Sequence, residues 1–99
     1  MRPIHLARLD KTRPVLVLTR ELVRPHLRRV TIAPITSTAK GLSTELAVGP
    51  RNGLDHESVV SLDNALTIPA VDLGRQLGFL LPEQETALTA ALVIAFDLE

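Results

Sequence analysis

The hydrophobic positions in the first half of the chain fall into short runs that predict β-strands. Ile4–Leu9 alternates loosely between apolar and polar residues, as in a half-exposed strand. Val15–Leu18 and Val30–Ile35 are apolar at nearly every position, which is typical of central strands. Proline has no N–H for a strand ladder, so we expect Pro14 at the start of its strand and Pro34 at an edge or bulge.

Three further strands are predicted beyond residue 43: Thr44–Val48, Ser58–Leu66 and Gln76–Leu80. Pro69 should end the second of them, and Gly74 and Gly78 indicate turns around the third. Between the early strands, Glu21–His26 is expected to be irregular, because the residue before Pro25 avoids helical geometry.

The one clear helix prediction is Pro82–Phe96. Proline suits a first helical position, and two glutamates follow it, at the end where the helix dipole favours negative charge. Its apolar residues nearly surround the helix, which indicates deep burial or a subunit contact. Short strands with turn signals and one terminal helix predict a mainly β fold, a small curved antiparallel barrel that the helix seals, in a single domain over residues 1–99.

Composition restricts how this domain can be built. The chain has two aromatic residues and no cysteine, so its core must be aliphatic and it has neither a disulfide framework nor a thiolate zinc site. No apolar run approaches membrane-spanning length, and no secretory signal pattern opens the chain. We expect a cytoplasmic protein without membrane contact.

Charge is distributed unevenly along the chain, although the formal net charge is zero. Residues 1–40 carry nine cationic side chains against two acidic ones, and the remainder carries two against nine. This asymmetry fits a surface that faces a polyanion. It equally fits two halves that intermix in space and cancel each other's field.

The sequence offers little conventional hydrolase chemistry. The three histidines are scattered, the glycines form no phosphate loop, and no G-x-S-x-G nucleophile motif is present. Asp55, His56 and Glu57 follow an Asn-Gly turn, and a solvated loop is the better interpretation of them than a metal site.

Polar residues gather at two strand ends. Lys11, Thr12 and Arg13 precede one apolar run, and Thr36, Ser37 and Thr38 follow another. One reaction needs neither a metal nor a protein nucleophile, because RNA carries its own 2′-hydroxyl beside the phosphate. A fixed guanidinium and a hydroxyl can then neutralise the charge that develops on the phosphorane. From the residues alone, a solvated cation and an ordinary strand-end hydroxyl remain the alternatives.

A family resemblance bears on this choice. The stretches RPVLVLT, VTIAPITS, STELAV, GLDHESVVSLDNALTI and LGRQLGFLLPEQETALTAAL resemble, in order and spacing, the MazF/PemK family of bacterial toxin–antitoxin toxins. The resemblance extends from about residue 4 to residue 98. It implies a small SH3-like barrel of the CcdB/PemK type with a C-terminal helix.

The resemblance also implies an activity and partners. Members of this family are homodimers that cut single-stranded RNA without metal or cofactor, leaving a 2′,3′-cyclic phosphate and a 5′-hydroxyl. Each is controlled by a cognate antitoxin with an acidic, partly disordered segment. The family's catalytic arginine and threonine fall on Arg13 and Thr36. The candidate RNA contacts are Lys11, Thr12, Ser37, Thr38, Arg28 and Asn64, and Asp63 is expected to be a buried structural carboxylate that bonds backbone near the site.

The chain departs from the family pattern in two places. The connection before the Arg-Pro pair is only Asp10–Thr12, where relatives carry a longer Gly-rich loop, and Asp63-Asn64 replaces the usual Asp-Gln pair. Two other functions share this architecture. A CcdB-type gyrase poison needs a C-terminal tryptophan, which this chain lacks; a non-catalytic SH3-like module that binds peptide or nucleic acid is the remaining alternative.

Overall fold

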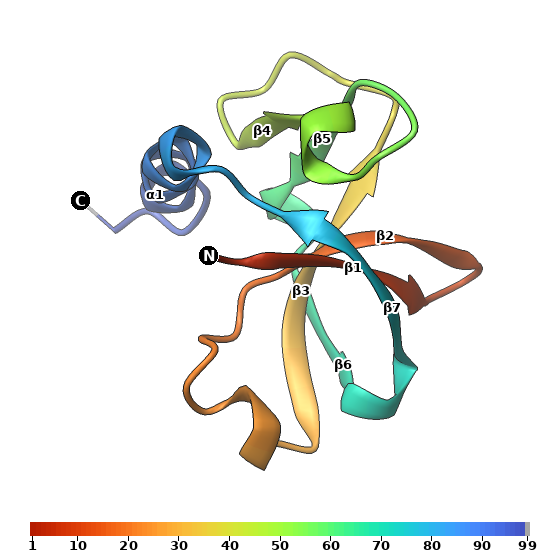
Figure 1. Cartoon of the computed structure of the whole chain (residues 1–99). Helices are drawn as coiled ribbons and strands as arrows, with labels where there is room; N and C mark the ends of the chain where they lie inside the picture. The colour runs from red at the N-terminus through yellow and green to blue at the C-terminus, as the bar shows by residue number, and fades with distance from the viewer. Residues whose placement is uncertain (99) are drawn as a thin grey trace.

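A strongly curled antiparallel sheet and one C-terminal helix make up the fold (Figure 1). The computed structural model describes residues 1–98. Its strands are β1 (Pro3–Arg8), β2 (Thr12–Val17), β3 (Arg29–Thr36), β4 (Glu45–Val48), β5 (Ser58–Ser61), β6 (Leu66–Pro69) and β7 (Leu73–Phe79), and its helix is α1 (Pro82–Ala95). The predicted mainly β fold with a terminal helix is therefore confirmed.

The sheet curls into a half-barrel because β3 pairs with three different strands. The order along the sheet is β4-β5-β3-β2-β1-β7, with β6 also paired to β3. The first half of β3 pairs with β6 from Arg29 to Ile32, and its end pairs with β5 at Ile35 and Thr36. Pro34 lies in the gap between these two partners, where one side of β3 needs no backbone donor.

The predicted single strand Ser58–Leu66 is wrong. A 3-10 turn at Leu62–Asn64 divides it into β5 and β6, so that each half pairs with a different part of β3. Leu62 is 1% exposed and faces the core from this turn. The alternation of apolar and polar residues therefore continues through the turn, and this pattern predicted one long strand. Pro69 is the last residue of β6, as expected.

The predicted strand Gln76–Leu80 is also corrected, because β7 runs from Leu73 to Phe79 and contains both glycines. Gly78 is needed for a close backbone approach rather than for a turn. A β-carbon there would lie 2.1 Å from the carbonyl oxygen of Asn52. Gly53 faces β7 at the same crossing with a φ of 87°, which favours glycine.

The first hairpin has its three-residue turn one residue earlier than the predicted connection Asp10–Thr12. The turn occupies Leu9–Lys11, and β2 already begins at Thr12, so Arg13 belongs to the strand and lies opposite Ala7. Pro14 is the third residue of β2 rather than its first, and it is tolerated because β2 pairs with β3 only from Val15 onward. The segment before β3 is irregular as predicted, with a 3-10 turn at Arg24–His26.

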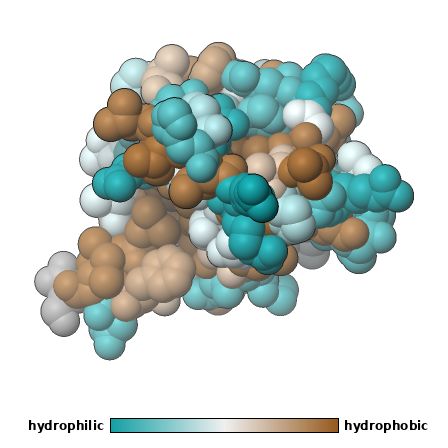
Figure 2. All heavy atoms as spheres, turned by 90° about the horizontal axis from the view of Figure 1, so that it is seen from below, coloured by the Kyte–Doolittle hydropathy of each residue, from teal (hydrophilic) through white to brown (hydrophobic). Residues whose placement is uncertain are grey.

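Helix α1 covers one of two hydrophobic clusters that lie on opposite faces of the sheet. Leu88 and Ala91 enter the larger cluster. Ala87, Ala90 and Ile94 remain exposed in the monomer. Figure 2 shows apolar side chains gathered near the C-terminal end, where Phe96 and Leu98 are more than half exposed. Within residues 1–98, none of the helical structure has the length and apolar character needed to cross a membrane.

Candidate active site

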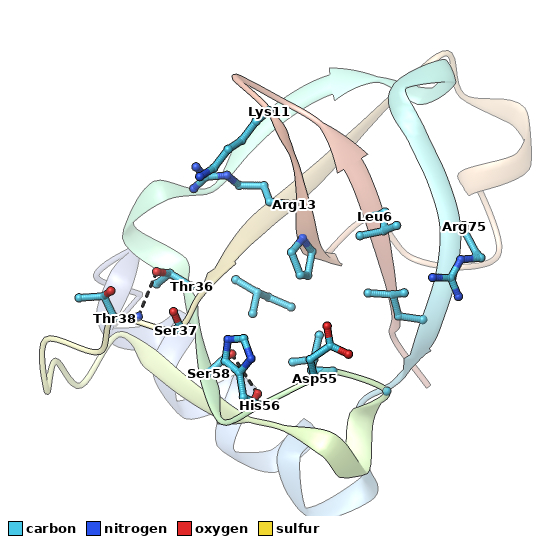
Figure 3. Close-up of a pocket in the computed structure, with 15 residues that line it drawn as sticks. Leu6, Lys11, Arg13, Thr36, Ser37, Thr38, Asp55, His56, Ser58 and Arg75 are labelled. Carbon is cyan, nitrogen blue, oxygen red and sulfur yellow. Dashed lines mark hydrogen bonds between the residues drawn. The ribbon is translucent and has the colours of Figure 1, made fainter.

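An open groove of about 770 Å³ lies where β2 begins, β3 ends and β5 begins. Strand β7 forms part of its wall (Figure 3). The side chains that line it come from distant parts of the sequence: Leu6, Lys11, Arg13, Pro14, Ile35, Thr36, Ser37, Thr38, Leu54, Asp55, His56, Ser58, Arg75 and Leu77, together with Gly53. Both predicted strand ends thus meet in one cavity.

Arg13 is held at the groove by the short hairpin. Its Nη2 lies 3.3 Å from Oδ2 of Asp10, and its side chain is 30% exposed while that of Asp10 is 73% exposed. The Nε of Arg13 is buried and has no hydrogen-bond partner in the described part of the chain. A buried donor without a partner is costly, so the hydrogen-bonding capacity of this guanidinium is not fully used within the described structure.

Thr36, Ser37 and Thr38 follow one another into the groove at the end of β3. Thr36 still pairs with Val59, which fixes its backbone. The amide of Thr38 donates to Oγ1 of Thr36 over 3.2 Å. The Thr36 hydroxyl is used there as an acceptor, so its own proton remains free for a ligand oxygen. Ser37 and Thr38 are exposed.

The loop that follows Thr38 is anchored by Glu45. The backbone amides of Lys40 and Leu42 donate to its carboxylate over 3.0–3.2 Å. These bonds, with the amide of Leu42 the largest contributor, lower the pKa of Glu45 below its ordinary value of 4.5. The carboxylate is therefore ionised in the folded protein at neutral pH and holds the backbone of the loop at Lys40 and Leu42.

The remaining predicted contacts do not all converge. Lys11 lines the groove, whereas Thr12, Arg28 and Asn64 are not among its lining residues. The amide of Asn64 instead donates to Ser61 Oγ over 2.8 Å. Asp63 is exposed rather than buried, and it accepts from the hydroxyl of Thr44 over 2.6 Å rather than from backbone. Its position in the middle of the 3-10 turn Leu62–Asn64, on the surface, explains the difference.

The sequence did not assign Asp55, His56, Ser58 or Arg75 to the site. The loop that carries Asp55 and His56 is exposed, as expected, but both side chains point from it into the groove (Figure 3). The order of the strands was the missing signal, because β5 begins beside the end of β3. Among the described residues, no three His, Asp or Glu side chains form a group that could hold a metal ion.

The charge of the groove is mainly positive. Lys11, Arg13 and Arg75 line it against one lining carboxylate, that of Asp55. Asp10 offsets Arg13 only from an exposed position. The basic N-terminal part of the chain thus supplies two cations here, and β7 supplies the third. Such a surface suits a phosphodiester backbone.

Comparison with known proteins agrees with this geometry. Residues 4–96 match the family model described as the PemK-like, MazF-like toxin of type II toxin–antitoxin systems. The chain is 64% identical over its whole length to Endoribonuclease MazF3 of Mycobacterium tuberculosis strain H37Rv, covering 96% of that protein.

Solved structures extend the comparison. Mycobacterium tuberculosis toxin MazF-mt6 superposes with a TM-score of 0.97 at 63% identity, with 99% of each chain covered. An endoribonuclease in complex with its cognate antitoxin, from a mycobacterial species, superposes with a TM-score of 0.87 at 26% identity, with coverage of 98% of this chain and 93% of that one.

Proposed function

Because the chain belongs to the PemK-like and MazF-like toxins of type II toxin–antitoxin systems, we propose that it is the toxin endoribonuclease of such a pair. Its substrate is single-stranded RNA, which it cuts without metal and with selectivity for sequence, and growth stops because translation is inhibited. The observation that carries the proposal is the meeting of Arg13 with Thr36–Thr38 in one cationic groove.

The reaction follows from what the groove provides. The ribose 2′-oxygen attacks the adjacent phosphorus, the P–O5′ bond breaks, and the products are a 2′,3′-cyclic phosphate and a 5′-hydroxyl. Arg13, which lines the groove, offers the donors of its planar guanidinium to the phosphorane oxygens. The hydroxyl of Thr36, which accepts from the Thr38 amide, donates a hydrogen bond to the same group. Lys11, Ser37 and Thr38 hold neighbouring phosphates.

The active form is a homodimer. The exposed alanines of α1 and Ile94 line a second, mostly apolar hollow of about 450 Å³ between the helix and β4. A chain of 99 residues has a small core, and covering this face with a second copy enlarges it. Thr38 lines the RNA groove and Ser43, on the same loop, lines the hollow, so the groove runs close to the dimer interface.

The cognate antitoxin acts on the RNA groove itself. Its inhibitory segment is acidic and disordered before binding, and its carboxylates take the phosphate positions near Arg13. Apolar anchors supply the specificity that charge lacks. The turn before β2 is only Leu9–Lys11, so the groove is already open and moves little when the segment binds.

Cleavage of a long single-stranded RNA by the purified protein in excess EDTA tests the function. We expect the wild type to cut, and Arg13→Ala to reduce kcat/KM by at least about two orders of magnitude. Arg13→Lys should also be poor, because it keeps the charge but loses the planar fork. Arg8→Ala removes an exposed arginine outside the groove and serves as the matched control. Full activity of Arg13→Ala would refute the assignment.

A further inference from the structure

The proposed reaction requires an acceptor for the proton of the 2′-hydroxyl, and neither proposed catalytic residue can be one. The guanidinium of Arg13 stays protonated at any working pH, and a threonine hydroxyl is a very weak base. Lys11, Arg13 and Thr36 all serve the groove as hydrogen-bond donors. None of these three side chains can act as a general base.

Two side chains in the groove can accept a proton, Asp55 and His56. An ordinary carboxylate is a much weaker base near neutral pH than an imidazole, and general-base catalysis is most efficient when the base titrates near the working pH. On chemical grounds His56 is therefore the better candidate.

The fold brings His56 to the proposed cleavage site. Thr36 and Val59 are opposite partners in the β3–β5 pair, and His56 lies three residues before Val59. The loop that carries it therefore leaves the sheet beside Thr36–Thr38. Ser58 Oγ donates to the carbonyl oxygen of His56 over 3.1 Å, which braces the loop. Figure 3 shows the ring pointing into the groove.

The charged groups around His56 come from three elements. Lys11 and Arg13 line the groove from the first hairpin, Arg75 lines it from β7, and Asp55 precedes His56 on its own loop. Glu57, the next residue, lines a different hollow beside Gly49. These cations place an RNA phosphate in the groove that the His56 ring enters.

We propose that His56 is the general base of the RNA cleavage, an inference that rests on the proposed function. An imidazole nitrogen takes the 2′-hydroxyl proton while the 2′-oxygen bonds to phosphorus. The P–O5′ bond breaks, and the 5′-oxygen leaves with the bonding electron pair and takes a proton from water. Arg13 and Thr36 stabilise the phosphorane but exchange no proton with the ribose.

His56→Gln tests this inference, with His26→Gln as the control, because His26 is an exposed histidine outside the groove. We expect His56→Gln to lower kcat by about 10²- to 10⁴-fold. The wild-type rate should rise with pH and level off across the range in which histidines titrate, about pH 5–8. The variant should lose this plateau and keep rising with hydroxide concentration. His56 is exposed, so melting temperatures should be unchanged.

A second substrate separates a base from an acid. In RNA with sulfur in place of the bridging 5′-oxygen, the leaving group needs no proton. We expect His56→Gln to remain as impaired on this substrate as on ordinary RNA. Recovery to the wild-type rate would make His56 the acid and overturn the proposal, as would a raised KM with unchanged kcat.

The failure of this inference can be distinguished from the failure of the proposed function. Absence of any cleavage by the wild type in EDTA would contradict the endoribonuclease activity. Cleavage that needs Arg13 but not His56 would contradict only the assignment of the base. If Asp55→Asn rather than His56→Gln removed the plateau, the carboxylate would be the acceptor and the proposal for His56 would be wrong.

Discussion

The position of Arg13 depends on how few residues separate β1 from β2. A three-residue turn places Asp10 within 3.3 Å of the guanidinium and leaves no loop to lie over the groove. The pair is too exposed to add much stability. The ion pair restricts the rotamers of the Arg13 side chain. Its guanidinium would then bind a phosphate with less loss of conformational entropy.

Thr36→Val isolates the contribution of one hydroxyl. Valine keeps the β-branched shape that suits the end of β3, so the fold should be preserved. The variant loses the donor to the phosphorane, and we expect kcat/KM to fall by between about tenfold and a hundredfold. Single-turnover cleavage of a short RNA at saturating enzyme measures this directly.

Thr31→Val is the matched control, because Thr31 lies on the same strand outside the groove and its hydroxyl pairs with that of Thr67 over 3.0 Å. It should cut RNA at the wild-type rate. Equal losses in the two variants would mean that β3 had been disturbed, and the hydroxyl of Thr36 would then have no separate role.

Sequence reasoning identified the groove residues that lie at the ends of apolar runs and missed those whose position in the groove depends on strand pairing. Arg13 and Thr36 adjoin runs that are plainly strands, so their presence at strand ends could be predicted. His56 and Arg75 enter the groove only because β5 pairs with β3 and β7 pairs with β1. Those pairings are long-range, and no local pattern encodes them.

At the scale of elements, β3 determines the architecture. The pairing partner of β3 changes from β6 to β5 around Pro34. The sheet therefore bends there, and Thr36 reaches the groove. The helix was predictable to within one residue from its proline start and its apolar spacing. The division of residues 58–69 into two strands was not predictable. Buried Leu62 continues the alternation of apolar and polar residues through the turn that separates them.

Gly78→Ala tests the crossing between β7 and the turn at Asn52. The new methyl group would lie 2.1 Å from the Asn52 carbonyl oxygen, and both partners are backbone, which cannot rotate away. Overpacking of this kind costs about 2 kcal/mol or more, so we expect a clear fall in the unfolding midpoint in urea.

The neighbouring glycine provides the control. In Gly74→Ala the nearest atom to the new methyl group is the Leu6 carbonyl oxygen at 3.4 Å, an ordinary contact. This variant should unfold close to the wild type. If both glycines tolerated alanine equally, the close approach would not constrain the fold as described.

At the scale of the whole molecule, the apolar face of α1 makes a prediction about assembly. Ile94 is 54% exposed and lines the hollow beside β4. Arginine is larger than isoleucine, and covering its charge in an apolar contact would be costly, so Ile94→Arg should separate the proposed dimer into monomers. Sedimentation velocity at micromolar concentration measures the change.

Thr86→Arg adds the same charge to an exposed position of the helix that does not line the hollow. It should sediment as the wild type does, at the mass of a dimer. A wild-type monomer at these concentrations, or a dimer that survives Ile94→Arg, would place the contact elsewhere or remove it.

The last prediction concerns how the charge of the molecule serves inhibition. Lys11, Arg13 and Arg75 face the groove, while the arginines at positions 20, 24, 28 and 29 lie in or beside the irregular segment before β3 and do not line it. An acidic antitoxin segment that occupies the groove therefore competes with RNA for the same three cations.

Exposed charges are screened by salt, so the affinity of this antitoxin segment should fall as ionic strength rises. Arg13→Ala should weaken binding of the antitoxin segment as well as abolish cleavage. Arg28→Ala should change the affinity of the segment little. Isothermal titration of the purified segment at low and high salt gives both comparisons. If the affinity of the segment changed neither with salt nor with the Arg13 substitution, the inhibitor would bind another surface and block the groove only indirectly.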